Sequence, residues 1–164
     1  MYQASAPRFV NMLTNLSAIL DKAQAHVDAK KIDAAVLTTY RLFPDMFPMT
    51  RQVQVACDAA KGAVARLAGV GIPKHEDTEQ TLAELQARIA KTIEFVQSIK
   101  PAQLDGTENK DIRLKLSGKH VRFKGMQYLL GFALPHFYFH VTTAYNILRH
   151  NGVEIGKRDY IGRP

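Results

Sequence analysis

The chain has 164 residues, 46% of them hydrophobic, and a formal net charge of +7. This length suits one domain that buries its own core without crosslinks. A single cysteine excludes an intrachain disulfide and fits a reducing compartment. No stretch approaches the ~18 uninterrupted apolar residues of a membrane span, and the N-terminus lacks the pattern of a signal peptide. We therefore expect one cytoplasmic domain over residues 1–164, without a membrane partner.

The positive charge is concentrated between Lys110 and Lys124 and in the tail that starts at Lys157. Basic stretches attract nucleic acids or anionic substrates. Neither stretch interleaves the aromatic residues on which bases stack, and no zinc-finger or helix-turn-helix spacing is present. We interpret the excess as a solvated basic face and expect no nucleic-acid partner.

The first hundred residues show the periodicity of amphipathic helices. Apolar residues recur at steps of three and four in three segments. Pro48 suits the first turn of the second segment, and Gly69 or Gly71 suits its end. The third segment must end before Pro101. We expect long helices over residues 6–29, over 48–68, and from 77 or 78 to a point before Pro101, with a short segment over 33–40.

The period changes after residue 110. Apolar and basic residues alternate over residues 112–116 and again over 121–123, on either side of Ser117-Gly118, which predicts a β-hairpin. A last long helix is expected over residues 126–150, followed by an extended tail to Pro164. The expected fold class is all-α: an antiparallel four-helix bundle with the short β-hairpin inserted between the third and fourth long helices.

The most informative feature is a His-x-x-x-His pair, His136 and His140, in the last helix. Residues four apart lie on one helical face, and the helical wheel turns both histidines toward the interior. Two buried imidazoles need hydrogen-bond partners or a shared cation, and imidazole binds Zn, Ni, Cu and Fe. The pair could equally be a core imidazole bonded to a tyrosine or a carbonyl. Pro135 removes one backbone bond and predicts a kink beside His136.

These pieces, in this order, resemble the DinB/YfiT-like superfamily of metalloenzymes, and more closely the bacterial DUF1993 family. The resemblance covers nearly the whole chain. It implies a four-helix bundle, often dimeric, with a site at one mouth of the bundle. It rests on three stretches: residues 43–48 (FPDMFP), 51–61 (RQVQVACDAAK) and 136–152 (HFYFHVTTAYNILRHNG).

Metal-binding members of the superfamily use three histidines, two from the last helix and one from the second. His136 and His140 match the first two, but the second-helix position falls at about Gln54, and that helix has no histidine. Asp58, one turn on, could supply a carboxylate, although the wheel favours a solvated or lysine-paired side chain. Gln54 could instead hydrogen-bond to a histidine without any metal. The candidate pocket is thus Gln54, Asp58, His136 and His140, and the candidate cofactor is a divalent transition metal, zinc or nickel.

Three functions remain open. The first is a binding module, or degenerate metal site, that holds a small molecule in the polar pocket. The second is a metal-dependent enzyme of the thiol-transfer or hydrolytic type, in which the cation lowers the pKa of water or of a thiol. The third is an oligomeric interaction protein, a homodimer, favoured by the small residues of the second helix. Cys57 is interpreted as a buried structural cysteine, since a nucleophile would need a base or a cation such as Lys61 to activate it.

Overall fold

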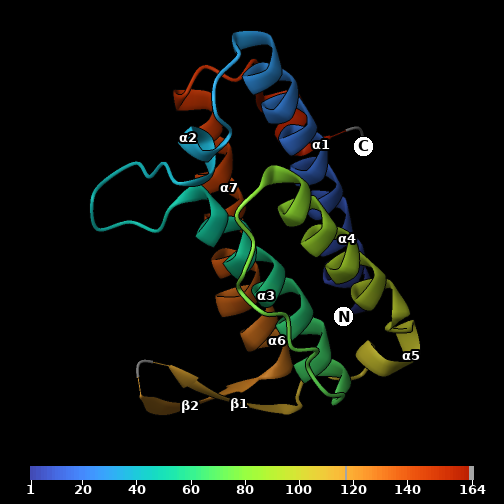
Figure 1. Ribbon diagram of the computed structural model, residues 1–164. Helices are drawn as coiled ribbons and strands as arrows, with labels where there is room; N and C mark the ends of the chain where they lie inside the picture. Colours follow the sequence, from blue (N-terminus) through green and yellow to red (C-terminus); the bar gives the residue numbers. More distant parts are fainter. Residues whose placement is uncertain (117, 163–164) are drawn as a thin grey trace.

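The computed structural model describes residues 1–116 and 118–162. Within them the chain is mostly helical, with one two-stranded antiparallel sheet (Figure 1). No described helix is both long and apolar enough to cross a membrane. The long helices are α1 (Ala6–Lys30), α3 (Met49–Ala68), α4 (Leu82–Ser98) and α7 (Leu134–His150), and the short ones are η1 (Tyr2–Ala4), α2 (Ala35–Thr38), α5 (Pro101–Leu104), α6 (Gly125–Tyr128) and α8 (Lys157–Ile161).

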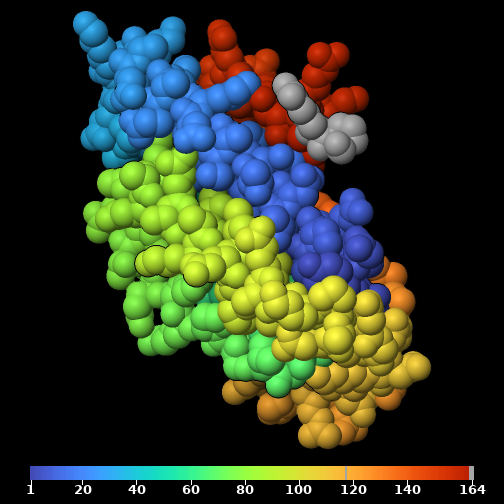
Figure 2. Space-filling model, turned by 90° about the vertical axis from the view of Figure 1, so that its right-hand side faces the viewer, coloured from blue at the N-terminus to red at the C-terminus, as the bar shows by residue number. Residues whose placement is uncertain are grey.

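Helix α1 follows its sequence prediction closely. It ends where Lys31 adopts a left-handed conformation with a φ of 54°. Its apolar stripe is buried, and Phe9, Leu13 and Leu16 are fully enclosed. This stripe packs on α4, and the two helices lie side by side in the view of Figure 2.

Helix α3 is the central element, because it packs against both α7 and α4. It ends at Gly69, whose φ of 76° favours glycine. The small side chains of this helix are buried within the chain itself: Ala56, Ala60 and Ala63 are fully buried. Small residues at these positions let the neighbouring helices approach closely.

Helix α4 begins later than the periodicity predicted. Thr81 caps it by accepting a hydrogen bond from the backbone N–H of Glu84. The Glu84 carboxylate in turn accepts from the backbone N–H of Thr81, which completes a capping box. The predicted start at residue 77 or 78 is wrong, because the capping box places the N-cap at Thr81. Residues 70–81 instead form a non-helical segment that passes over α3 (Figure 1).

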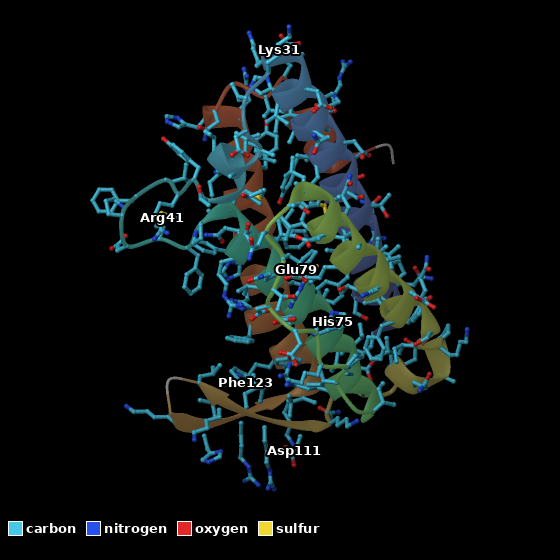
Figure 3. The ribbon with its side chains drawn as sticks, viewed as in Figure 1. Lys31, Arg41, His75, Glu79, Asp111 and Phe123 are labelled. Atoms are coloured by element: carbon cyan, nitrogen blue, oxygen red, sulfur yellow. The ribbon has the colours of Figure 1, made fainter. Side chains whose placement is uncertain are left out.

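The predicted hairpin is present as β1 (Asp111–Leu116) and β2 (Lys119–Lys124). Its turn includes residue 117, which lies outside the described residues. Ile112 pairs with Phe123 and Leu114 with Val121, so the apolar side chains share one face. Figure 3 shows Phe123 on the side toward the helices and Asp111 on the opposite side. The hairpin therefore covers one end of the helices.

The last long helical run extends from Gly125 to His150, but it is not a uniform α-helix. Between α6 and α7, residues Leu129–Ala133 form a π-helical segment (η2), and the N–H of Leu134 bonds to the Leu129 carbonyl five residues back. Pro135 has no N–H, so a continuous α-helix would leave the Gly131 carbonyl without its partner. The irregularity expected beside His136 thus takes the form of a π segment directly before it.

Gly125 allows this run to start close to the chain that precedes β1. A Cβ at Gly125 would lie 1.9 Å from the Thr107 carbonyl oxygen. The next residue, Met126, donates its backbone N–H to the Glu108 carbonyl at 2.9 Å. Only glycine fits this approach, which fixes the start of the helical run relative to the hairpin.

The sequence analysis predicts an extended tail, but within the described residues the tail is not fully extended. It forms the short helix α8, which packs on α1. Asn15 donates to the Tyr160 carbonyl at 3.1 Å, and Lys22 pairs with Asp159 at 2.6 Å. Asp159 also accepts a hydrogen bond from the backbone N–H of Gly156, one of the groups left unpaired at the start of a helix. One local bond at its start and two contacts with α1 thus hold this short helix.

Candidate functional site

His136 and His140 lie one turn apart on α7. Their ring centroids are 4.7 Å apart, and the rings stand nearly perpendicular at 86°. His140 is buried, with 5% of its surface exposed, whereas His136 is half-buried. The pair therefore spans the boundary between the core and a surface opening.

Gln52 of α3 holds His140 in one orientation. Its side-chain Nε2 donates to the Phe47 carbonyl at 3.0 Å, which turns the amide oxygen toward the histidine. That oxygen, Oε1, lies 2.7 Å from Nδ1 of His140. Because the oxygen can only accept, Nδ1 must carry the proton. The remaining ring nitrogen, Nε2, is then left with a free lone pair.

Both imidazoles are neutral at physiological pH. Burial, together with charge repulsion from a protonated His136 and from Arg51, lowers the pKa of His140 to about 4. Burial also lowers the pKa of His136 below its ordinary value. Among the described residues, no group hydrogen-bonds to Nε2 of His140 or to either ring nitrogen of His136. The pair thus presents unprotonated nitrogens with no protein partner.

Gln54, the second-helix position inferred from the sequence, faces a different cluster. Its Nε2 donates to a Glu79 carboxylate oxygen at 2.9 Å, and its Oε1 accepts from Arg51 at 3.2 Å. The hydrogen bond to the histidines that was expected for Gln54 is made by Gln52 instead. Residues two apart on an α-helix point to nearly opposite sides, so the two glutamines serve separate networks.

The network around Gln54 is centred on Arg88 of α4, which is 2% exposed. Its guanidinium lies 2.9 Å from each of Glu79, Asp58 and Asp77. It also donates to the Glu76 carbonyl at 3.0 Å. Figure 3 labels Glu79 and His75 on the segment that crosses α3. This buried arginine therefore ties residues 70–81 to α3 and α4.

Asp58 belongs to the same network and is also paired with Lys61 at 2.8 Å. Its charge is thus balanced by two cations. At the same time Asp58 and His136 line one cleft, of about 320 Å³, beneath the hairpin. This volume lies at the lower end of the ~300–1,000 Å³ typical of ligand pockets. The cleft is bounded by α3, β1 and the last helical run, through Val55, Asp58, Ala59, Arg66, Arg113, Leu114, Lys115, Leu116, Tyr128, Phe132, Ala133 and His136.

One wall of the cleft is a row of aromatic rings. Tyr128 and Phe132 are stacked with their centroids 6.0 Å apart, and Phe132 stacks on His136 at 5.5 Å with an interplanar angle of 14°. The row continues to His140, and Phe123 of the hairpin packs against its other end. The spacing of four residues places these rings on one helical face. His136 is therefore the last ring of the row that lines the cleft, and His140 lies next to it in the core.

The donor set does not complete a transition-metal site. The described residues contain no group of three His, Cys, Asp or Glu side chains arranged to hold a metal ion. Gln52, which stands next to His140, offers a neutral amide oxygen that already accepts a hydrogen bond. Transition-metal sites in proteins usually have three or four strong ligands. Two imidazoles alone would give a weak site.

Cys57 is not an activated nucleophile. It is fully buried, and burial raises the pKa of its thiol to about 12, despite the opposing hydrogen bond to Thr92 and the nearby charges of Arg88 and Lys61. A thiol with this pKa is not ionised near neutral pH. The interpretation of Cys57 as a structural residue agrees with this environment.

Sequence reasoning missed four residues of the site: Gln52, Arg66, Tyr128 and Phe132. Two signals were available. Gln52 precedes Val53 on the apolar stripe of α3, where a polar side chain requires a buried partner. Tyr128 and Phe132 continue the four-residue spacing of the histidines toward the N-terminus.

Comparison with known proteins places this fold in a family. The model of the domain of unknown function DUF1993 matches residues 1–161. The crystal structure of a DinB family member protein from Shewanella denitrificans is 45% identical, with a TM-score of 0.91 over 99% of this chain and 92% of that one. No curated protein gives a significant match. The chain therefore belongs to the DUF1993 family and has a DinB-like helical fold.

Proposed function

We propose that this protein is a small-molecule-binding module whose ligand occupies the cleft beneath the hairpin and contacts the histidine pair. In this proposal the long helices form an antiparallel four-helix bundle, and the cleft lies at the mouth that the hairpin covers. The hairpin, α3 and the last helical run each contribute to the lining, so a ligand there would touch three elements at once.

The observation that carries the proposal is the state of the two imidazoles. His140 is oriented by Gln52 with Nδ1 as the donor, and its Nε2 has no partner among the described residues. His136 lines the cleft and is likewise unpaired within the described chain. These nitrogens are accessible from outside, since the buried unpaired side-chain nitrogens of the described residues are Nδ1 of His75 and Nε of Arg88. Neutral imidazoles can both donate and accept, which suits an uncharged polar part of a ligand.

A metal-dependent enzyme is the second candidate. It is favoured by the hydrogen bond between Gln52 and His140, since metal-bound histidines commonly donate their other ring N–H to an oxygen acceptor. If zinc or nickel bound, His136 and His140 would hold it, and the ion would lower the pKa of a bound water or thiol. The incomplete donor set makes this the weaker candidate.

Elemental analysis of protein purified without a histidine tag separates the two candidates. The binding module predicts well under one zinc or nickel per chain, and weak, non-saturating calorimetric titrations with Zn²⁺ and Ni²⁺. Stoichiometric metal that disappears in His136→Ala would contradict it and establish the metal site. His26→Ala, on α1 and outside the cleft, is the matched control.

A cytoplasmic homodimer remains part of the proposal. Its support is an apolar surface on the chain between α2 and α3, where Phe43 is 63% and Phe47 50% exposed, and on α7, where Phe139 is 56% exposed. Contiguous exposed apolar patches mark protein–protein interaction sites. Light scattering that gives a monomer at high protein concentration would remove the dimer from the proposal.

A further inference from the structure

Arg66 supplies an unpaired positive charge at one end of the cleft. It is half-buried, and its Nη1 donates to the Tyr128 hydroxyl at 3.1 Å. Among the described residues, no carboxylate lies within salt-bridge distance of Arg66, in contrast to Arg88 with its three carboxylates. A guanidinium has five N–H donors, and a partly desolvated one is costly without an anion. Arg66 is therefore set to bind an acceptor that the chain itself does not provide.

The position of this guanidinium is built into the helix. A Cβ at Gly62 would lie 2.5 Å from Nη1 of Arg66. The arginine side chain therefore folds back along α3 over the bare backbone of Gly62, and Tyr128 holds its end. Any larger residue at Gly62 would displace the charged group.

The wall that follows Arg66 is aromatic. Tyr128, Phe132 and His136 stack in sequence along it. The facing side of α3 contributes Val55 and Ala59, whose small side chains leave room for a flat group. Ring-on-ring packing favours planar ligands with offset or edge contacts. At the far end of the stack, His136 offers a neutral nitrogen.

The overall charge of the cleft is positive. Asp58 is the acidic residue of the lining, and Lys61 and Arg88 already neutralise it at 2.8 and 2.9 Å. Arg66 is then the charged side chain of the lining that has no ionic partner among the described residues, since Arg113 and Lys115 lie on the outer face of β1 with Asp111. Such a field attracts anions to the opening.

We infer that the cleft binds a small planar organic anion, an aromatic or heteroaromatic carboxylate. Its carboxylate accepts hydrogen bonds from Arg66, its ring lies along Phe132 and His136, and a polar ring atom reaches the histidine end. The inference rests on the proposed function and specifies the ligand class for the same site.

The test compares two pairs of probes that differ only in charge: benzoate with benzamide, and nicotinate with nicotinamide. Calorimetry or ligand-observed NMR gives the affinities for the intact protein. Charge-assisted hydrogen bonds predict that each carboxylate binds about tenfold or more tightly than its amide. The imidazole NMR signals of His136 should shift on binding.

Two variants and one control identify the residue that confers the preference for the carboxylate. Arg66→Gln should abolish the preference for the carboxylate, while Arg149→Gln, an exposed arginine on α7, should leave it intact. Gly62→Ala keeps Arg66 but displaces its guanidinium, so it should also weaken carboxylate binding about tenfold. A urea unfolding curve for each variant verifies that the binding change does not reflect loss of the fold.

Equal affinity for the carboxylate and amide probes overturns the inference, as does a preference that survives in Arg66→Gln. If both amides bind as well as the carboxylates and shift the His136 signals, the proposed function stands and only the ligand charge is wrong. If none of the four probes binds, the inference fails. The proposed function fails separately if a neutral fragment library also leaves the His136 and His140 signals unmoved.

Discussion

Gln52 and His140 are joined by a 2.7 Å hydrogen bond that crosses from α3 to α7 and fixes which nitrogen of the imidazole carries the proton. The bond depends on a second one, because the amide of Gln52 is itself oriented by the Phe47 carbonyl. Two neutral hydrogen bonds thus determine the chemistry available at the histidine pair.

Replacing Gln52 with glutamate should reverse the titration of His140. A carboxylate beside Nδ1 favours the protonated ring, so the pKa of His140 should rise from about 4 to above its ordinary value of 6.5. An NMR titration of the imidazole signals measures this directly. Gln54→Glu is the matched control, since Gln54 faces Glu79 and Arg51, and it should leave His140 largely unchanged. A His140 pKa that stays near 4 in Gln52→Glu would contradict the assigned bond.

The buried neutral histidine should also make the protein acid-sensitive. The unfolded chain binds a proton at His140 near pH 6.5, whereas the folded chain does so only near pH 4. The free energy of unfolding must therefore fall as the pH drops through this window, by about 3 kcal/mol at most from His140 alone. Urea denaturation at pH 7.0, 6.0 and 5.0 measures the slope.

His140→Gln removes this titration while its amide can still donate to Gln52. The slope between pH 6.5 and 4.5 should become shallower, and part of it should remain because the pKa of His136 is also lowered. His120→Gln, on the exposed hairpin, is the control. The carboxylates Asp77 and Glu79, with lowered pKa values, lose their stabilising contribution only at lower pH, below about 4.5. An unchanged slope in His140→Gln would contradict the prediction.

Arg88→Met should destabilise the fold and release the segment over α3. Removing the guanidinium leaves Asp58, Asp77 and Glu79 clustered without their shared cation. Breaking a buried ion pair in this way costs about 3–5 kcal/mol. Lys91→Met, an exposed substitution on the same helix, should cost little. Chemical unfolding gives the energies, and limited proteolysis should show faster cleavage within residues 70–81 in Arg88→Met alone.

Gly125 and Gly131 should respond oppositely to alanine. At Gly125 the new Cβ would collide with the Thr107 carbonyl, so the backbone must move, at a cost on the order of 2 kcal/mol or more. At Gly131 the Cβ would meet nothing within 4 Å, and alanine should be neutral or stabilise by up to about 1 kcal/mol. Thermal and urea unfolding of the two variants test the pair. Equal effects would show that the close approach at Gly125 does not constrain the hairpin.

Cys57 should be inert in the folded protein. Its thiol is fully buried and its pKa is raised to about 12, so a disulfide reagent such as dithionitrobenzoate should not react at pH 8. One thiol per chain should react once the protein is unfolded in urea. Lys91→Cys in a Cys57→Ala background provides an exposed thiol that should react at once. Rapid reaction of Cys57 in the native protein would contradict the complete burial of its thiol.

The sequence predicted the long helices and the hairpin because their signals are local. The apolar steps of α1 and the alternation of β1 and β2 follow from residues close in the chain. The start of α4 was misplaced because one capping pair, Thr81 and Glu84, overrode the weaker start signals before it. The π segment was also missed, since Pro135 indicates an irregularity without saying which form it takes.

The site was harder to predict because it depends on which face of α3 meets α7. The resemblance implies a site residue at Gln54, two residues from Gln52, which is the glutamine that contacts His140. An error of two residues on a helix is a rotation of about 200°, which moves a side chain to the opposite side. Spacing along one helix placed the histidines together, but only the packing of two helices could identify Gln52 and Arg66.

The π segment Leu129–Ala133 has a consequence for the shape of the cleft. On a regular α-helix, side chains four apart advance by about 40° at each step, so a row of four rings would wind around the axis. A π turn holds more residues, and a step of four within it falls short of a full turn. The backward rotation offsets the forward drift over Tyr128, Phe132, His136 and His140. One wide turn thus lines up Tyr128, Phe132 and His136 as a row along one wall of the cleft.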